Sequence, residues 1–250
     1  MYYRYGLYIK DVAILKKYGD SSYKFTLHRY LRQPGFEPEK KKCEKVNDSK
    51  LDCNISRARA KVFEYALCNP WDWFVNLTLS KEKYDRYDLS KYISDLTQWL
   101  RDYRKRHCIK VSYLFIPEHH KDMAWHIHGF LMGLPADHLT EFIPGVHPQK
   151  LIDAGYLNWE AYSNKFGYVS VGKVKNREAS AKYITKYISK DMAKNNKDIG
   201  AHLYYCSNGL QKAVEMKRGT MLGDMIPDYE NEYVKVQWLD SLQDACITIV

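Results

Sequence analysis

The chain has 250 residues, with 39 Lys and Arg against 30 Asp and Glu, a formal net charge of +9 and a pI near 9.0. Its 45% apolar and 28% charged residues are typical of a globular protein and exclude a collagenous or disordered chain. No apolar run reaches the roughly 18 to 20 residues that a transmembrane helix needs, and the start MYYRYGLYIK has no signal-peptide h-region, so we expect a cytoplasmic protein without a membrane partner. The basic balance favours an anionic partner, foremost nucleic acid.

The positive charge is concentrated in two segments. Residues 1–70 carry 15 basic and 8 acidic residues, residues 173–197 carry 8 and 2, and the chain from Asp224 onward carries 1 and 6. The acidic tail either solvates the C-terminus or competes with nucleic acid for the basic surface. The six cysteines contain no CxxC pair, which argues against a thiolate zinc site or a redox motif.

The first half of the chain predicts two helices between short strands. Runs rich in Tyr, Ile and Leu up to about Phe36 predict one or two strands, and a charged loop follows over 37–55. Ser56 is the expected N-cap of a helix, because apolar residues recur at helical spacing behind it. The next predicted elements are a strand over 71–80 and an amphipathic helix over 89–107.

The second half predicts an antiparallel hairpin, an irregular connection and a last helix. The hairpin joins strands over 110–118 and 125–133 across a short polar loop. After irregular residues 134–167, the predicted elements are a strand over 167–174, a helix over 176–194 and a strand over 202–207. This order favours an α+β fold with an antiparallel sheet and helices packed against it. We expect three parts, namely a β-rich N-terminal extension packed on the core (1–55), a central domain (56–207) and a C-terminal segment with the acidic tail (208–250).

Two histidines of one predicted strand form a candidate metal platform. The two-residue period of a strand places His126 and His128 on one face. If the hairpin pairs residue 118 with residue 126, Glu118 lies on the same face, whereas a one-residue slip sends it to the other. Such a set suits Mn²⁺ or Mg²⁺ with open water positions, and would also suit Zn²⁺. The alternative is two unrelated structural histidines; His119 and His120 lie in the turn and are taken as bystanders.

Two tyrosines lie one turn apart on the last predicted helix. Ala181, Ile184, Ile188 and Met192 form its expected buried stripe, and Tyr183 and Tyr187 lie together off that stripe. A basic row runs beside them, made of Lys182, Lys186, Lys190 and Lys194. Phenols beside ammonium groups suit an attack on a phosphodiester, because Tyr is a nucleophile and Lys stabilises phenolate or phosphate. The alternative is ordinary packing and solvated charge on an amphipathic helix.

Three segments in this order, FVNLTLS, WHIHGFL and KYITKYISKD, resemble the signature segments of the HUH endonucleases. The similarity is closest to rolling-circle replication initiators of small single-stranded DNA phages, bacterial plasmids and related mobile elements, and covers about residues 56–207. It implies a five-stranded antiparallel sheet with flanking helices, an RRM-like core, with the His pair on a central strand and the Tyr helix lying over it.

The resemblance also implies an activity and residues that carry it. Family members nick one DNA strand at an origin, keep the 5′ phosphate on Tyr and leave a 3′-OH for a polymerase. The implied metal ligands are His126, His128 and Glu118. Tyr187 is the first choice of nucleophile, because it stands in a Lys-Tyr-x-x-Lys-Asp string, and the remaining implied catalytic residues are Tyr183, Lys186 and Lys190. Residues expected to contact DNA are Thr78 of FVNLTLS, Lys182 and Lys194.

The implied partner is single-stranded DNA at a replication origin. The sequence has no phosphate-binding GKT or GKS loop, so we expect a host helicase and a host polymerase to unwind and copy the DNA. Two other functions stay open at this point. One is an RRM-like module that binds single strands without catalysis, and the other is a transposase or relaxase of the HUH group. The oligomeric state does not follow from the sequence.

Overall fold

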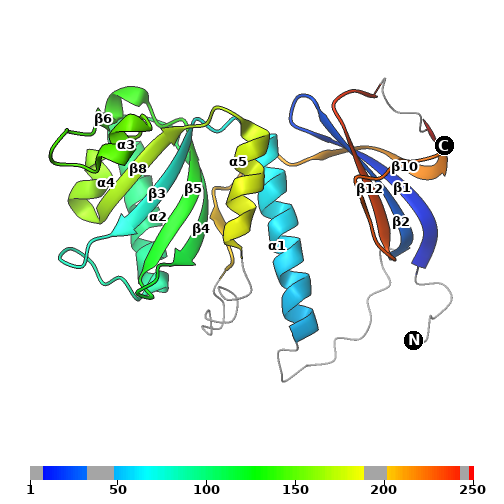
Figure 1. The fold of residues 1–250 in the computed structure, drawn as a ribbon, viewed down its shortest axis with the longest axis horizontal. Helices are drawn as coiled ribbons and strands as arrows, with labels where there is room; N and C mark the ends of the chain where they lie inside the picture. Colours follow the sequence, from blue (N-terminus) through cyan, green and yellow to red (C-terminus); the bar gives the residue numbers. More distant parts are fainter. Residues whose placement is uncertain (1–7, 33–47, 189–201, 243–247) are drawn as a thin grey trace. The chain divides into compact units, whose positions relative to one another are not determined.

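The computed structural model describes residues 8–32, 48–188, 202–242 and 248–250, with the side chains of residues 32 and 48–53 left aside. The chain divides into two compact units (Figure 1), one of residues 47–210 and one that combines residues 1–46 with residues 211–250. Among the described helices, none combines the length and the apolar character that crossing a membrane requires.

The larger unit is built on an antiparallel sheet in the order β6-β7-β8-β3-β5-β4-β9. Its longer strands are β3 (Trp73–Leu79), β4 (Ser112–His119), β5 (Trp125–Met132) and β8 (Gly167–Lys173). The short ones are β6 (Thr140–Glu141), β7 (Leu157–Asn158) and β9 (Tyr205–Cys206). The expected five-stranded sheet is therefore present as β8-β3-β5-β4-β9, and two short strands extend one edge.

Helices cover both faces of this sheet. They are α1 (Asp48–Cys68), α2 (Leu89–His107), α3 (Gln149–Asp153), α4 (Glu160–Lys165) and α5 (Arg177–Ile184), with 3₁₀ turns η1 (Ala136–His138) and η2 (Thr185–Tyr187). α2 packs on the face that carries Val75, Leu77 and Ile127. α1 and α5 lie side by side on the opposite face (Figure 1) and bury its apolar residues. The sandwich is the α+β, HUH-like fold expected from the sequence.

The helix α2 begins and ends where the sequence predicts, because both of its ends are capped. The Asp88 side chain accepts a hydrogen bond from the Lys91 backbone N–H at 2.9 Å. At the other end, Cys108 adopts the left-handed conformation with φ of 53°. The helix buries one apolar stripe, made of Leu89, Tyr92, Ile93, Leu96, Trp99, Leu100 and Tyr103.

Two helix boundaries differ from the prediction. α1 starts at Asp48, so Ser56 lies inside it and does not cap it; the buried stripe already includes Ile55, and polar residues on the exposed side hide the earlier turns from a pattern search. The last helix ends at Ile184, continues as the single turn η2, and reaches Ile188 in an extended conformation. The Ile188 carbonyl accepts a hydrogen bond from Arg59 Nε at 2.8 Å in place of a helical partner. Residues 189–194 of the predicted helix lie outside the described part.

The smaller unit is a six-stranded antiparallel sheet in the order β11-β12-β2-β1-β10-β13. The strands are β1 (Tyr8–Tyr18), β2 (Ser22–Arg32), β10 (Val214–Leu222), β11 (Tyr229–Glu230), β12 (Val234–Leu239) and β13 (Thr248–Ile249). The N-terminal strand β1 pairs with the C-terminal strand β10, and β2 pairs with β12. The sequence treats the two ends of the chain as separate segments, whereas in the structure they form one sheet.

Candidate active site

Strand alternation creates a polar patch on the face of the larger sheet that α1 and α5 cover elsewhere. We call this side the histidine face, defined by Phe74, Asn76 and Thr78 of β3, by Leu114, Ile116 and Glu118 of β4, and by His126, His128 and Phe130 of β5. Leu114, Ile116 and Phe130 are buried against the two helices. Beyond this apolar part, the polar residues of the face remain only partly buried.

The hairpin register decides whether Glu118 joins the histidines. β4 and β5 pair Glu118 with His126 and Ile116 with His128, which is the register that places the carboxylate on the histidine face. Gly129 helps to set this pairing, since a Cβ there would lie 2.5 Å from Phe115 Cδ1 and 2.6 Å from the Leu114 carbonyl oxygen. The two strands can therefore approach closely only with glycine at this position.

The three side chains converge on one point. Glu118 Oε2 lies 3.0 Å from His126 Nε2 and 3.0 Å from His128 Nε2, and the two nitrogens are 3.1 Å apart. Neighbouring ligands of an octahedral ion with bonds of about 2.1 Å are about 3.0 Å apart, so the donor set fits a divalent cation bound on one side. The cluster could hold a metal ion, and its identity does not follow from the ligands.

The protonation of the cluster favours metal binding. Burial lowers the pKa of His128, although the hydrogen bond to Glu118 opposes this, and a neutral imidazole is the form that binds a metal. Partial burial acts to raise the pKa of Glu118, but the hydrogen bonds and charges of His126 and His128 outweigh it and lower that pKa to about 2. At neutral pH, Glu118 is therefore an ionised ligand.

Asn76 orients His128, and the sequence analysis missed this role. Asn76 Oδ1 can only accept, so His128 Nδ1, 2.5 Å away, carries the proton and leaves Nε2 free for a metal. The Asn76 amide nitrogen in turn donates to Ser170 Oγ at 3.1 Å, which fixes the orientation of the amide. Asn76 stands two residues before Thr78 in FVNLTLS, so the strand period could have revealed that both lie on the face of the histidines.

The two tyrosines lie beside the metal ligands. The ring of Tyr187 stacks on His128, with centroids 3.6 Å apart and planes 13° from parallel. Tyr187 Oη donates to Tyr183 Oη at 2.5 Å, and the Tyr183 ring contacts Phe74 edge to face. Burial raises the pKa of Tyr187 above its usual range, and the Tyr183 hydrogen bond and the charge of Glu118 act in the same direction. Without DNA and metal, the Tyr187 phenol is therefore protonated at neutral pH.

The predicted basic row is described only in part. Lys186 Nζ lies 5.8 Å from the centre of the Tyr183 ring, and Lys182 forms an ion pair with Glu178 at 2.5 Å. Lys190 and Lys194 lie outside the described residues. Thr78 is on the histidine face, where the β3–β5 pairing places it opposite His126.

The two histidines of the turn point to other partners. His119 Nδ1 lies 2.9 Å from the Met123 carbonyl oxygen and its ring packs on Trp125. His120 lies 3.3 Å from Asp122 and packs edge to face against His126, with ring centres 5.7 Å apart. Neither belongs to the Glu118 cluster, although His120 borders it.

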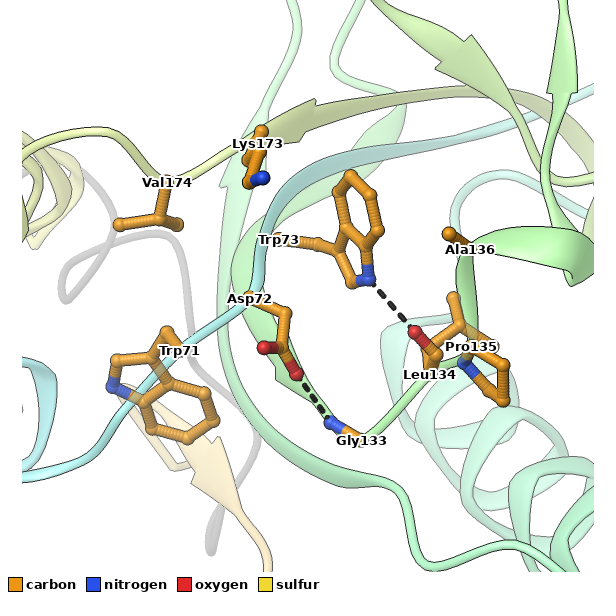
Figure 2. A pocket seen from close by; sticks show the side chains of 9 residues that line it. All are labelled: Trp71, Asp72, Trp73, Gly133, Leu134, Pro135, Ala136, Lys173 and Val174. Atoms are coloured by element: carbon orange, nitrogen blue, oxygen red, sulfur yellow. Dashed lines mark hydrogen bonds between the residues drawn. The ribbon is translucent and has the colours of Figure 1, made fainter.

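A pocket of about 490 Å³ lies at the other end of β3 (Figure 2). Asp72 there accepts a hydrogen bond from the Gly133 backbone N–H at 2.6 Å, and Trp73 Nε1 donates to the Leu134 carbonyl at 2.9 Å. These polar groups hold the chain that follows β5. None of the residues predicted as site residues lines this pocket, so it is separate from the cluster.

The fold and site together define an HUH-like α+β protein, with a His-x-His pair on a central strand and two tyrosines on the element that covers it. Residues 72–192, a little under half of the chain, match the family model of the replication-associated protein ORF2. That segment thus belongs to a replication-associated family, which confirms the resemblance to rolling-circle initiators and supports a role in starting replication. Comparisons with curated proteins and with solved structures find no match.

Proposed function

We propose that this chain is a metal-dependent endonuclease and strand transferase that initiates rolling-circle replication on single-stranded origin DNA. The observation that carries the proposal is the stacking of Tyr187 on His128, because it brings a nucleophile to a His, His and Glu cluster. Both features fall within the segment that matches the replication-associated family. Stacking alone would suit a structural tyrosine; stacking on a metal ligand at 3.6 Å suits attack on a phosphate held there.

The cluster would hold the scissile phosphate through a divalent cation, Mg²⁺ or Mn²⁺. Such an ion supplies charge that polarises the phosphoryl oxygens. Glu118, His126 and His128 occupy one side of the site and leave the other open for the DNA. Asn76 keeps His128 in the tautomer that a cation requires, and Thr78 lies along the same face, where it would contact the strand.

The tyrosines would carry the covalent chemistry. Tyr187 Oη attacks phosphorus, one P–O bond forms and the P–O3′ bond breaks, and the phenol proton ends on the departing 3′ oxygen. The products are a 5′-phosphotyrosine and a free 3′-OH that a polymerase can extend. Tyr183, whose oxygen is 2.5 Å away, would make the second cleavage that ends a round of replication. Lys186, together with Lys190, would stabilise the developing charge.

Unwinding and synthesis would be left to a helicase and a polymerase of the host. Lys182 and Lys194 would bind the DNA backbone beside the tyrosines. Lys182 is already paired with Glu178, so a phosphate would have to displace that carboxylate.

The proposal is tested with a random pool of single-stranded oligonucleotides labelled at the 3′ end. The full chain is incubated with the pool and Mn²⁺, and a denaturing gel is searched for labelled protein. We expect a covalent adduct that disappears in EDTA, and sequencing of the attached DNA would return the recognition sequence. A module that binds without catalysis gives a complex on a native gel and no adduct on the denaturing gel, which would refute the proposal.

A further inference from the structure

A second pocket lies on the α2 side of the larger sheet, against the edge formed by β4 and β9. Its volume is about 400 Å³. Three basic side chains line it: Arg101 and Arg104 from α2 and Lys110 from the loop before β4. Hydroxyl groups complete the lining, among them that of Ser207, which accepts a hydrogen bond from the Tyr113 backbone N–H at 2.9 Å.

The three cations have no counter-charge among the described residues. The described hydrogen bonds of Arg101 include one to the neutral Gln98, at 2.6 Å, and neither Arg101, Arg104 nor Lys110 forms an ion pair with any described residue. Arg104 Nε is buried without a hydrogen-bond partner. A guanidinium N–H of Arg104 reaches Ser207 Oγ only at 3.5 Å. Burying part of a guanidinium without an anion is costly, so the arrangement is incomplete as it stands.

We propose that this pocket binds a phosphate group of the DNA, away from the site of cleavage. Guanidinium groups bind phosphate oxygens in pairs, and three positive charges with hydroxyl groups around them suit a phosphodiester with its sugar. The pocket includes Ser112, six residues along β4 from Glu118, which corresponds to about 20 Å of strand. A DNA strand held at the cluster could therefore continue around the sheet edge into the pocket. The identity of the ligand as DNA rests on the proposed function, whereas its phosphate chemistry does not.

The test removes the pocket charges one at a time. Arg101→Gln and Arg104→Gln are compared with Arg106→Gln, which removes the same charge from an exposed position of the same helix outside the pocket. Binding is measured at several salt concentrations for oligonucleotides of about 6 and about 20 nucleotides. We expect each pocket variant to weaken binding of the longer strand about tenfold and to flatten its salt slope by about 0.7, with little effect on the shorter strand. Arg106→Gln should cause a much smaller change.

Two further measurements keep the outcome clear. Arg104→Lys retains the charge, so it should retain the salt slope while losing part of the affinity, which a folding defect would not produce. Inorganic phosphate, added to protein labelled for NMR of arginine Nε, should shift the Arg104 signal. A phosphate-induced shift without any effect of the variants on DNA binding would assign the pocket to a free phosphate compound and overturn the DNA proposal. No shift and unchanged slopes would overturn the phosphate site itself. If the chain binds DNA and never cleaves it, the proposed function fails while the slopes still test the pocket.

Discussion

Replacing Asn76 by alanine tests whether the second layer of the site sets its metal affinity. The substitution removes the acceptor that holds the proton on His128 Nδ1, so the ring can rotate or carry its proton on Nε2, the metal-binding atom. Loss of such a partner typically weakens metal binding by about 10- to 100-fold, or about 1.4 to 2.7 kcal/mol. We therefore expect the Mn²⁺ dissociation constant to rise by that factor.

The same change has a smaller, separate effect on stability. Ser170 is buried and loses its partner, which costs about 1 kcal/mol and corresponds to a fall of about 2 to 4 °C in the melting temperature. Isothermal titration with Mn²⁺ and thermal unfolding without metal distinguish the two effects. His119→Ala is the matched control, because it removes a neighbouring imidazole that does not reach the cluster, and its Mn²⁺ affinity should be unchanged. An Asn76→Ala protein that binds Mn²⁺ as tightly as the unaltered chain would refute the assigned role of Asn76.

Three further predictions concern the ligands, the tyrosines and the smaller unit. His126→Ala should abolish nicking yet leave the fold and weak DNA binding intact, and cleavage at full rate by this variant would remove the metal from the mechanism. Tyr187→Phe should lose the first adduct, whereas Tyr183→Phe should form it and fail to release joined circles; the reverse pattern would exchange their roles. In the smaller unit, burial and then the charge of Lys24, with further help from Arg218 and Lys16, lower the pKa of His28 below 6.5. The unfolded chain therefore binds more protons below that pH, so stability should fall on acidification through this window, and His28→Gln should flatten a plot of melting temperature against pH.

The parts of the fold that follow from local patterns could be predicted from the sequence. The spacing of apolar residues gives α2 with both of its ends, because its caps and its buried stripe are local. The alternation in WHIHGFL places His126 and His128 on one face, and the short loop makes the pairing of Glu118 with His126 one of two possible registers. The structure selects between them through side-chain packing across the sheet, which a single strand does not encode.

The parts that depend on distant pairing could not be predicted. β1 and β10 are separated by about two hundred residues, and nothing in either strand names its partner, so the sequence treats the ends of the chain as separate segments. The end of α5 depends on Arg59 of α1, which binds the Ile188 carbonyl. The α2 pocket likewise combines a helix, a loop and the chain beyond β9, and its charges appear in the sequence only as scattered basic residues.

The central claim is that a tyrosine beside the His, His and Glu cluster becomes joined to DNA, and mapping the adduct tests it most directly. The protein is allowed to react with single-stranded DNA and Mn²⁺, the DNA is trimmed by nucleases, and the peptides are analysed by mass spectrometry. We expect the mass of a 5′-nucleotide on the peptide that contains Tyr187 in the unaltered chain, and no modified peptide when both Tyr183 and Tyr187 are replaced by Phe. A nucleotide on any other residue, or an adduct that persists in the double variant, would contradict the account.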